Sequence, residues 1–105
     1  MKVVVAIERG VGAIDIIRVL NREVKEGDTV TEVIEPGRTV VLDWCFKNGV
    51  NYNIVSMPEF VRSAVREADK VVVVFLKEVK YHSPVGYTFR YAKEVGKPVR
   101  VYVVG

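Results

Sequence analysis

Cysteine, histidine and glutamine are scarce in this chain of 105 residues. Cys45 is the only cysteine and His82 the only histidine, and glutamine is absent. A lone cysteine excludes an internal disulfide and a cysteine-based metal cluster, and a lone histidine excludes a multi-histidine metal site. We therefore expect no metal and no cofactor. The lack of glutamine beside abundant glutamate, lysine and arginine is a bias of hyperthermophile proteins, so a thermophile source is expected.

Long apolar runs and clusters of one charge are also missing. No run approaches the roughly 20 residues that cross a bilayer. The apolar start Val3–Ile7 is too short for a signal peptide and lacks a small-residue cleavage site, so we expect a cytoplasmic protein with no membrane partner. The net charge is +3, but acidic and basic residues alternate between Glu59 and Lys80 without forming a basic stripe. Nucleic acid is therefore not an expected partner.

The apolar residues that are present form alternating strand and helix patterns. A chain of 105 residues has room for one domain, residues 1–105. The block Val71–Leu76 is wholly apolar, which is typical of a parallel strand covered on both faces. The expected strands are Lys2–Ile7, Val30–Glu35, Tyr52–Val55, Lys70–Leu76 and Pro98–Val104, and the expected helices are about Gly12–Lys25, Arg38–Lys47, Pro58–Ala68 and Pro84–Val95.

This strict alternation predicts the fold class. The fold is α/β, a three-layer αβα sandwich around a five-stranded, parallel, doubly wound sheet with right-handed crossovers. We expect the strand order 3-2-1-4-5, in which the strand order reverses between the first and fourth strands. Ligands of such folds bind at this switch point, beyond the carboxyl ends of the strands.

The sequence also predicts two details of the helices. Apolar residues recur at 4-3-4 spacing in the first helix, and its expected inward face is Ala13, Ile17, Leu20 and Val24. Ser56 and Glu59 have the spacing of a capping box at the start of the third helix, so Ser56 is the expected N-cap.

Two glycines, Gly10 and Gly12, follow the first expected strand. They match the first two glycines of G-x-G-x-x-G, but Asp15 stands at the third position, which weakens a dinucleotide interpretation. Two interpretations stay open. The glycines form a tight turn, or they let a phosphate contact the free amides of a helix N-terminus, with Arg9 beside it.

The second turn, residues 35–39, contains Gly37, Arg38 and Thr39. Gly37 would allow a close backbone approach, Arg38 could reach a phosphate, and Thr39 could cap the following helix. The alternative is a plain strand–turn–helix junction with a solvated arginine. Glu35 stands roughly where a ribose-binding acid sits in dinucleotide folds.

The loop after the fourth strand leads into Ser83, Gly86 and Thr88. Amides at the start of the next helix point toward the switch point, and the two hydroxyls would suit a phosphate or a ribose. Ser83 followed by Pro84 is also the pattern of an N-cap, and both roles can hold at once. Three nearby aromatic residues could stack on a base, pack internally or form a dimer surface: Tyr81, Tyr87 and Tyr91.

Three stretches of the chain carry a family resemblance. Val3–Arg9 is a strand that runs into a turn with small residues and an arginine. Residues 62–75 form an arginine-led helix pattern that passes through Ala-Asp into a strand, and residues 83–99 combine a glycine–threonine loop, a helix and Gly-Lys-Pro-Val. Together they resemble the SLOG superfamily, the Rossmann-like group that includes DprA-type and YspA-like domains and the cytokinin-activating phosphoribohydrolases. The related nucleoside deoxyribosyltransferases are similar. The resemblance implies a nucleotide or nucleotide-derived ligand.

The chain departs from that family at its loops. Residues 35–41 lack the family's Gly-Gly pair, and Pro84–Thr88 lacks glycines of the phosphoribohydrolase loop and the glutamate that follows them. Thr88 stands where the deoxyribosyltransferases have a nucleophilic glutamate, and covalent glycosyl transfer needs a carboxylate there. The resemblance therefore implies binding without turnover.

Three functions stay open on this reasoning. The leading hypothesis is a nucleotide-binding site lined by Arg9, Gly10, Gly12, Gly37, Arg38, Thr39, Ser83, Gly86 and Thr88. The second is hydrolysis or transfer at the N-glycosidic bond of a nucleotide, with Glu8 or Glu35 as the catalytic carboxylate. The third is a ligand-free scaffold that acts through a homodimer surface.

Overall fold

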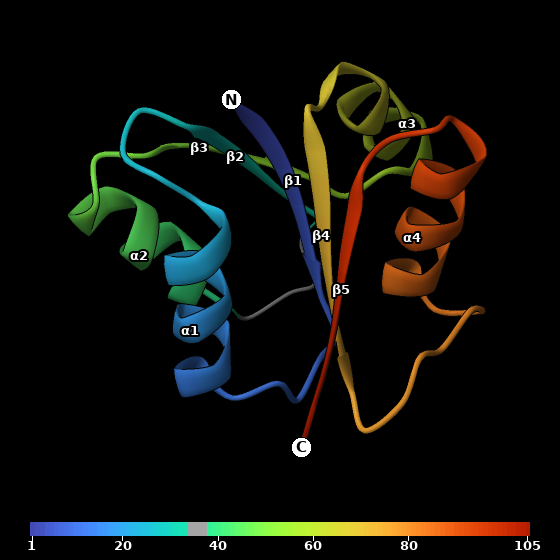
Figure 1. Ribbon diagram of the computed structural model, residues 1–105, viewed down its shortest axis with the longest axis horizontal. Helices are drawn as coiled ribbons and strands as arrows, with labels where there is room; N and C mark the ends of the chain where they lie inside the picture. Colours follow the sequence, from blue (N-terminus) through green and yellow to red (C-terminus); the bar gives the residue numbers. More distant parts are fainter. Residues whose placement is uncertain (34–37) are drawn as a thin grey trace.

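The computed structural model describes residues 1–33 and 38–105, which alternate strictly between strand and helix (Figure 1). The strands are β1 (Lys2–Ile7), β2 (Thr29–Val33), β3 (Asn51–Val55), β4 (Lys70–Leu76) and β5 (Val99–Val104). The helices are α1 (Ala13–Glu23), α2 (Val40–Lys47), α3 (Pro58–Glu67) and α4 (Pro84–Glu94). Within this part of the chain, no helix combines the length and the apolar character needed to cross a membrane.

The sheet confirms the predicted fold class and strand order. Its strands are parallel and follow the order β3-β2-β1-β4-β5. Helices α1 and α2 lie on one face of the sheet, and α3 and α4 lie on the other, so the molecule has three layers (Figure 1). The switch point therefore lies between β1 and β4, because β1 leads to a helix on one face and β4 leads to a helix on the other.

The two central strands form the core of the molecule. All side chains of Val3–Ile7 and Val71–Phe75 are at most 2% exposed. Because successive side chains of a strand point to opposite faces, Val3 and Val5 pack under α1 and α2, while Val4 packs under α3 and α4. Burial of each such valine contributes about 1.5–3 kcal/mol to stability. This rigid centre fixes the positions of the loops that follow β1 and β4.

The inward face of α1 differs from the one that the apolar spacing predicts. The buried residues of the helix are Ile16, Val19, Leu20 and Glu23. Ile17 is 39% exposed and Ala13 is also at the surface, so that part of the prediction is wrong. The face that is buried includes Glu23, whose carboxylate accepts hydrogen bonds from Lys70 and Tyr102. A pattern of apolar residues does not reveal a buried charge whose partners lie far away in the sequence.

The capping box predicted at Ser56 is also wrong. Met57 is the N-cap of α3, and its side chain makes no capping hydrogen bond in the part of the chain that the structure describes. Pro58 occupies the first helical position, and the amides of Phe60 and Val61 donate to the Met57 carbonyl. The helix begins one residue later than a capping box at Ser56 requires.

Candidate functional site

The candidate site lies at the carboxyl edge of the sheet, where β1, β2 and β4 end at Ile7, Val33 and Leu76. Parallel doubly wound sheets bind ligands at this edge, near the switch point. Loops from both sides of the switch point meet there, so side chains far apart in the sequence come together. The hydrogen bonds between these loops determine which groups remain available to a ligand.

Glu8 ties the end of β1 to the loop that follows β4. Its carboxylate accepts a hydrogen bond of 2.5 Å from the Leu76 amide and lies 2.9 Å from the Lys80 ammonium. Burial opposes ionisation, but the hydrogen bonds from Lys80 and Leu76 and the charge of Lys80 together lower the pKa of Glu8 below its usual value. Glu8 is thus an ionised brace between two loops. Both of its oxygen atoms bind protein groups, whereas a catalytic carboxylate has to contact the sugar carbon of its substrate.

Arg38 braces the same edge from the β2–α2 connection. Its two terminal nitrogens donate to the carbonyls of Glu8 (3.1 Å) and Ile7 (2.5 Å). The Arg38 guanidinium, for which the sequence suggested a phosphate contact, is therefore hydrogen-bonded to the end of β1. Thr39 is the N-cap of α2, but its hydroxyl bonds to Asp43 rather than to a backbone amide. The predicted residues Glu35 and Gly37 lie outside the described residues.

A buried glutamate, Glu32, lies beside Arg38, and the sequence analysis did not single it out. Glu32 lies in β2 with its side chain fully buried, and it accepts a hydrogen bond of 2.6 Å from the Tyr52 hydroxyl. Its other oxygen lies 3.7 Å from Arg38 Nε, and neither of these two atoms has a hydrogen-bond partner among residues 1–33 and 38–105. Burial raises the pKa of Glu32 more than Tyr52 and Arg38 lower it. The sequence signal that could have indicated Glu32 was a single carboxylate, between Thr31 and Val33, in a short and partly apolar strand.

The N-terminus of α1 is open at the carboxyl edge. Gly12 is its N-cap and offers no side chain to the first-turn amides, and no atom of the described residues lies within 4 Å of a Cβ placed there. Gly10 has a φ of +94°, a conformation that favours glycine, and a Cβ there would come 3.0 Å from the side chain of Leu76. Arg9 is exposed on the same loop. The open amides are therefore suited to an anion.

The predicted residues of α4 have internal roles. Ser83 is the N-cap of α4, which confirms one of the two roles that the sequence predicted for it. Its hydroxyl accepts a hydrogen bond from the Gly86 amide at 3.0 Å and donates one to the Lys80 carbonyl at 2.9 Å. Thr88 is fully buried and donates to the Pro84 carbonyl. A Cβ on Gly86 would come 2.0 Å from the Lys80 carbonyl oxygen, so this glycine accommodates the chain's own loop. The close approach at Gly86 is made by protein backbone.

A cavity of about 390 Å³ opens beside these residues, between the N-termini of α3 and α4. This volume lies within the range of about 300–1,000 Å³ that is usual for ligand pockets. Tyr87 and Arg90 line it, and the Tyr87 hydroxyl accepts a hydrogen bond from Arg62 at 2.8 Å. The lining residues in the described part of the chain are Val33, Ser56, Pro58, Val61, His82, Ser83, Pro84, Tyr87, Thr88 and Arg90. The sequence analysis considered Tyr87 but missed Arg90, which lies on the same helix.

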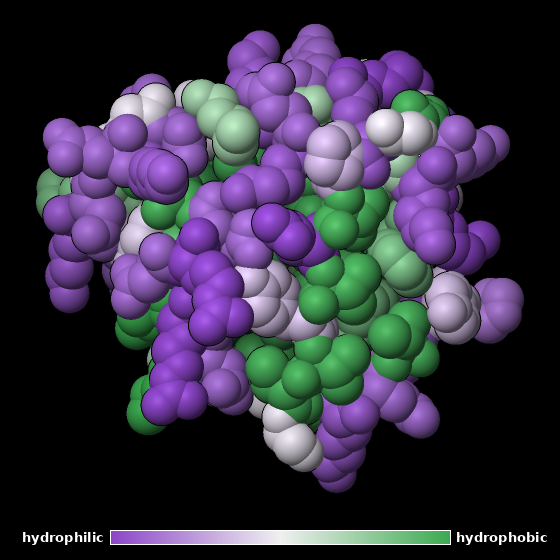
Figure 2. All heavy atoms as spheres, viewed as in Figure 1, coloured by the Kyte–Doolittle hydropathy of each residue, from purple (hydrophilic) through white to green (hydrophobic). Residues whose placement is uncertain are grey.

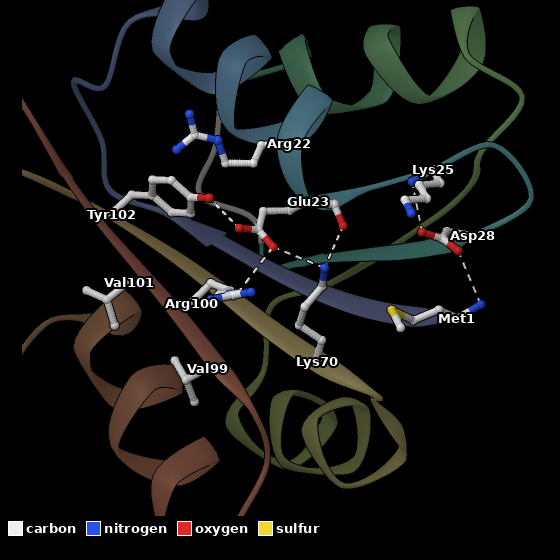
Figure 3. A pocket seen from close by; sticks show the side chains of 10 residues that line it. All are labelled: Met1, Arg22, Glu23, Lys25, Asp28, Lys70, Val99, Arg100, Val101 and Tyr102. Carbon is white, nitrogen blue, oxygen red and sulfur yellow. Dashed lines mark hydrogen bonds and ion pairs between the residues drawn. The ribbon is translucent and has the colours of Figure 1, made fainter.

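A cavity larger than this one lies at the opposite, amino edge of the sheet (Figure 3). Its volume is about 770 Å³. Lys70 Nζ donates to the carbonyl and the carboxylate of Glu23, and Asp28 pairs with the amino group of Met1 at 3.2 Å. Basic residues here complement the negative end of the α1 dipole. We place the candidate site at the carboxyl edge because ligands of parallel doubly wound sheets bind at that edge.

Comparison with known proteins adds no assignment. No family model matches the chain, and no curated protein or solved structure is significantly similar to it. Within residues 1–33 and 38–105 there is no group of three or more histidine, cysteine, aspartate and glutamate side chains arranged to hold a metal ion. The functional argument therefore depends on the geometry of the carboxyl edge.

Proposed function

We propose that this chain binds a nucleotide or nucleotide-derived ligand at the carboxyl edge, in the cavity between α3 and α4. The single observation that carries the proposal is the pairing of Tyr87 and Arg90 in the wall of that cavity. An aromatic ring can stack on a base, and a guanidinium can bind a phosphate through charged hydrogen bonds. The open amides of α1 at Gly12 provide a second anion-binding group at the same edge.

Arg90 is well suited to a ligand because its side chain is only partly used. Its Nε donates to the Tyr81 carbonyl at 2.9 Å, which fixes the side chain at the mouth of the cavity. Within residues 1–33 and 38–105 its terminal nitrogens donate no hydrogen bond, and the guanidinium carbon lies 6.0 Å from the centroid of the Tyr87 ring. A guanidinium that is held in place before the ligand arrives loses little conformational entropy on binding.

Binding without turnover is the form of the proposal that the cavity supports. None of the described residues that line it is an aspartate or a glutamate. Thr88, the position at which a glycosyl-transferring relative would carry its nucleophile, is buried and hydrogen-bonded to Pro84. Covalent glycosyl transfer needs a carboxylate beside the sugar.

The test is thermal stabilisation by nucleotides, cyclic nucleotides, ADP-ribose and ribose phosphates. A ligand at 100 times its dissociation constant adds about 2.7 kcal/mol to the free energy of unfolding. Arg90→Ala should weaken a phosphate-bearing ligand by about 1–3 kcal/mol. Lys93→Ala is the matched control, because it removes a cation from the same helix without touching the cavity.

Two results would reject the proposal. One is the absence of any shift in the unaltered protein at millimolar ligand, and the other is an equal loss of affinity in Arg90→Ala and Lys93→Ala. Chromatography of the incubated ligand checks for turnover. Release of a free base would mean that the protein cleaves the N-glycosidic bond of the ligand and does not only bind it.

A further inference from the structure

The cavity at the amino edge of the sheet has more basic than acidic side chains in its lining. Of the 16 basic and 13 acidic residues of the chain, four and two line this cavity, so two of the three excess positive charges lie here. Figure 2 shows hydrophilic side chains over the upper part of the molecule, where α1 ends and β5 begins, and apolar ones lower along β5. The basic residues of the lining are Arg22, Lys25, Lys70 and Arg100, and the acidic ones are Glu23 and Asp28.

Both acidic side chains of this lining are already bound by protein groups. One carboxylate oxygen of Glu23 accepts a hydrogen bond from Lys70 at 3.0 Å, and the other accepts one from the Tyr102 hydroxyl. The carboxylate of Asp28 lies 3.2 Å from the N-terminal amino group and accepts a hydrogen bond from the Lys25 amide at 2.9 Å. The described lining therefore offers a cation no carboxylate that is not already bound.

Three basic side chains remain available to an anion. In the part of the chain that the structure describes, the exposed side chains of Arg22 and Lys25 form no ion pair with a carboxylate. The Arg100 side chain is 68% exposed, and its Nε lies 3.7 Å from a Glu23 oxygen, which is too far for a hydrogen bond. Figure 3 shows Arg22 and Arg100 on either side of the hydrogen bond that joins Tyr102 to Glu23. Guanidiniums from α1 and β5 thus border one cavity.

Two negative groups at this edge oppose an anion, and Lys70 offsets both. The carboxyl end of α1 carries about half a negative charge, and Glu23 is ionised beside it. Lys70 Nζ donates to the Glu23 carbonyl at 2.7 Å and to its carboxylate at 3.0 Å. Burial and the hydrogen bond to Glu23 raise the pKa of Tyr102, and Arg22 is close enough to its hydroxyl to oppose this rise. The charge of Arg22 therefore acts inside the cavity.

We propose that this cavity binds a small ligand with two or more phosphate groups, through Arg22, Lys25 and Arg100. A guanidinium forms paired hydrogen bonds with phosphate oxygens, and three separate cations match an anion whose charge is spread over several groups. The cavity volume of about 770 Å³ lies within the usual range for ligand pockets, about 300–1,000 Å³, so there is room for more than one phosphate. The described linings of this cavity and of the one between α3 and α4 share no residue, so the proposal does not depend on nucleotide binding at the carboxyl edge.

The test is calorimetric titration with tripolyphosphate at low and at physiological salt. We expect binding that weakens as salt is added, because salt screens exposed charges. Arg22→Ala and Arg100→Ala should each weaken binding by about tenfold, which is the effect of losing one charged hydrogen bond. Arg18→Ala is the matched control, because it removes the same charge from an exposed position one turn earlier on α1 and does not line the cavity.

Several results would overturn the proposal. Absence of binding at millimolar tripolyphosphate rejects the site, and an equal loss of affinity in Arg18→Ala and Arg22→Ala attributes binding to the general charge of the surface. Orthophosphate that binds as tightly as tripolyphosphate contradicts a requirement for several phosphates, and citrate that does so contradicts the choice of phosphate. Short single-stranded DNA that binds more tightly than tripolyphosphate assigns the cavity to a nucleic acid.

Two further variants locate the bound anion. If Arg90→Ala alone weakens the binding of tripolyphosphate, the anion occupies the cavity between α3 and α4, and this proposal fails while nucleotide binding there stands. If Arg100→Ala fails to fold, as circular dichroism would show, Lys25→Ala takes its place, because the Lys25 side chain is exposed and forms no ion pair among the described residues. Unchanged affinity in both Arg22→Ala and Lys25→Ala rejects the site.

Discussion

At the scale of single residues, Glu32 makes folding sensitive to pH. Burial raises its pKa, so the folded chain binds a proton at this site more tightly than the unfolded chain. Its contribution to stability is therefore lost as pH rises from about 4.5 through the raised pKa. In Glu32→Gln the amide oxygen can still accept from Tyr52, and this loss should disappear. We expect the free energy of unfolding of the variant, relative to the unaltered protein, to increase between pH 4.5 and pH 7.

Urea unfolding at several pH values measures this difference. Glu94→Gln is a matched control, because it removes the same charge from an exposed position on α4. Glu32→Gln also loses the ion pair with Arg38, and this lowers its stability whether or not the pKa of Glu32 is raised. The change of the difference with pH, rather than its size at one pH, is thus the decisive quantity. A difference that is constant from pH 4.5 to pH 7 would mean that the pKa of Glu32 is not raised.

At the scale of elements, α4 depends on its serine cap and α3 does not. Ser83→Ala removes the acceptor of the Gly86 amide, and loss of such a cap costs about 1 kcal/mol of stability. Ser56→Ala makes the same chemical change beside α3, where no capping hydrogen bond exists, and should cost no more than about 0.5 kcal/mol. Chemical denaturation of both variants compares them directly. Equal costs would show that the Ser83 hydroxyl does not stabilise α4.

The elements themselves could be predicted from the sequence, because their signals are local. The apolar run of β4 and the Ser83-Pro84 start of α4 both depend on neighbouring residues, and both are confirmed. The inward face of α1 could not be predicted, because the partners of Glu23 lie on β4 and β5. Sequence spacing detects burial of apolar groups, and it does not detect a charge compensated from another strand.

The candidate site was predictable in place but not in the roles of its residues. The order of strands located the carboxyl edge and its loops. It could not show that Arg38 would bind the carbonyls of Ile7 and Glu8, since that contact joins segments about thirty residues apart. Similarly, Gly86 matched a ligand loop in the sequence, whereas the backbone of Lys80 fills the space beside it. Glycines and arginines serve packing and binding alike, and only the three-dimensional arrangement separates the two.

At the scale of the whole molecule, three carboxylates connect distant segments and should make the fold sensitive to acid. Glu8 binds the β4–α4 loop, Glu23 binds the start of β4 and the strand β5, and Asp28 pairs with Met1. In each case burial opposes ionisation, but hydrogen bonds and nearby positive charges outweigh it and lower the pKa. Their stabilisation is present above the pKa values of the unfolded chain and is lost as pH falls through the lowered values.

We therefore expect the free energy of unfolding to decrease as pH falls below about 4.5, because the unfolded chain then binds more protons at these three sites. Glu32 acts in the opposite direction between pH 4.5 and its raised pKa, so Glu32→Gln should lose more stability than the unaltered protein over the whole range from pH 7 to pH 3. Urea unfolding from pH 7 to pH 3 measures the slope, and Glu8→Gln should reduce it by removing one of the three groups. A stability that stays level from pH 4.5 to pH 3 would show that the ion pairs contribute little. The connections between loops would then depend on the central strands, whose apolar packing does not change with pH.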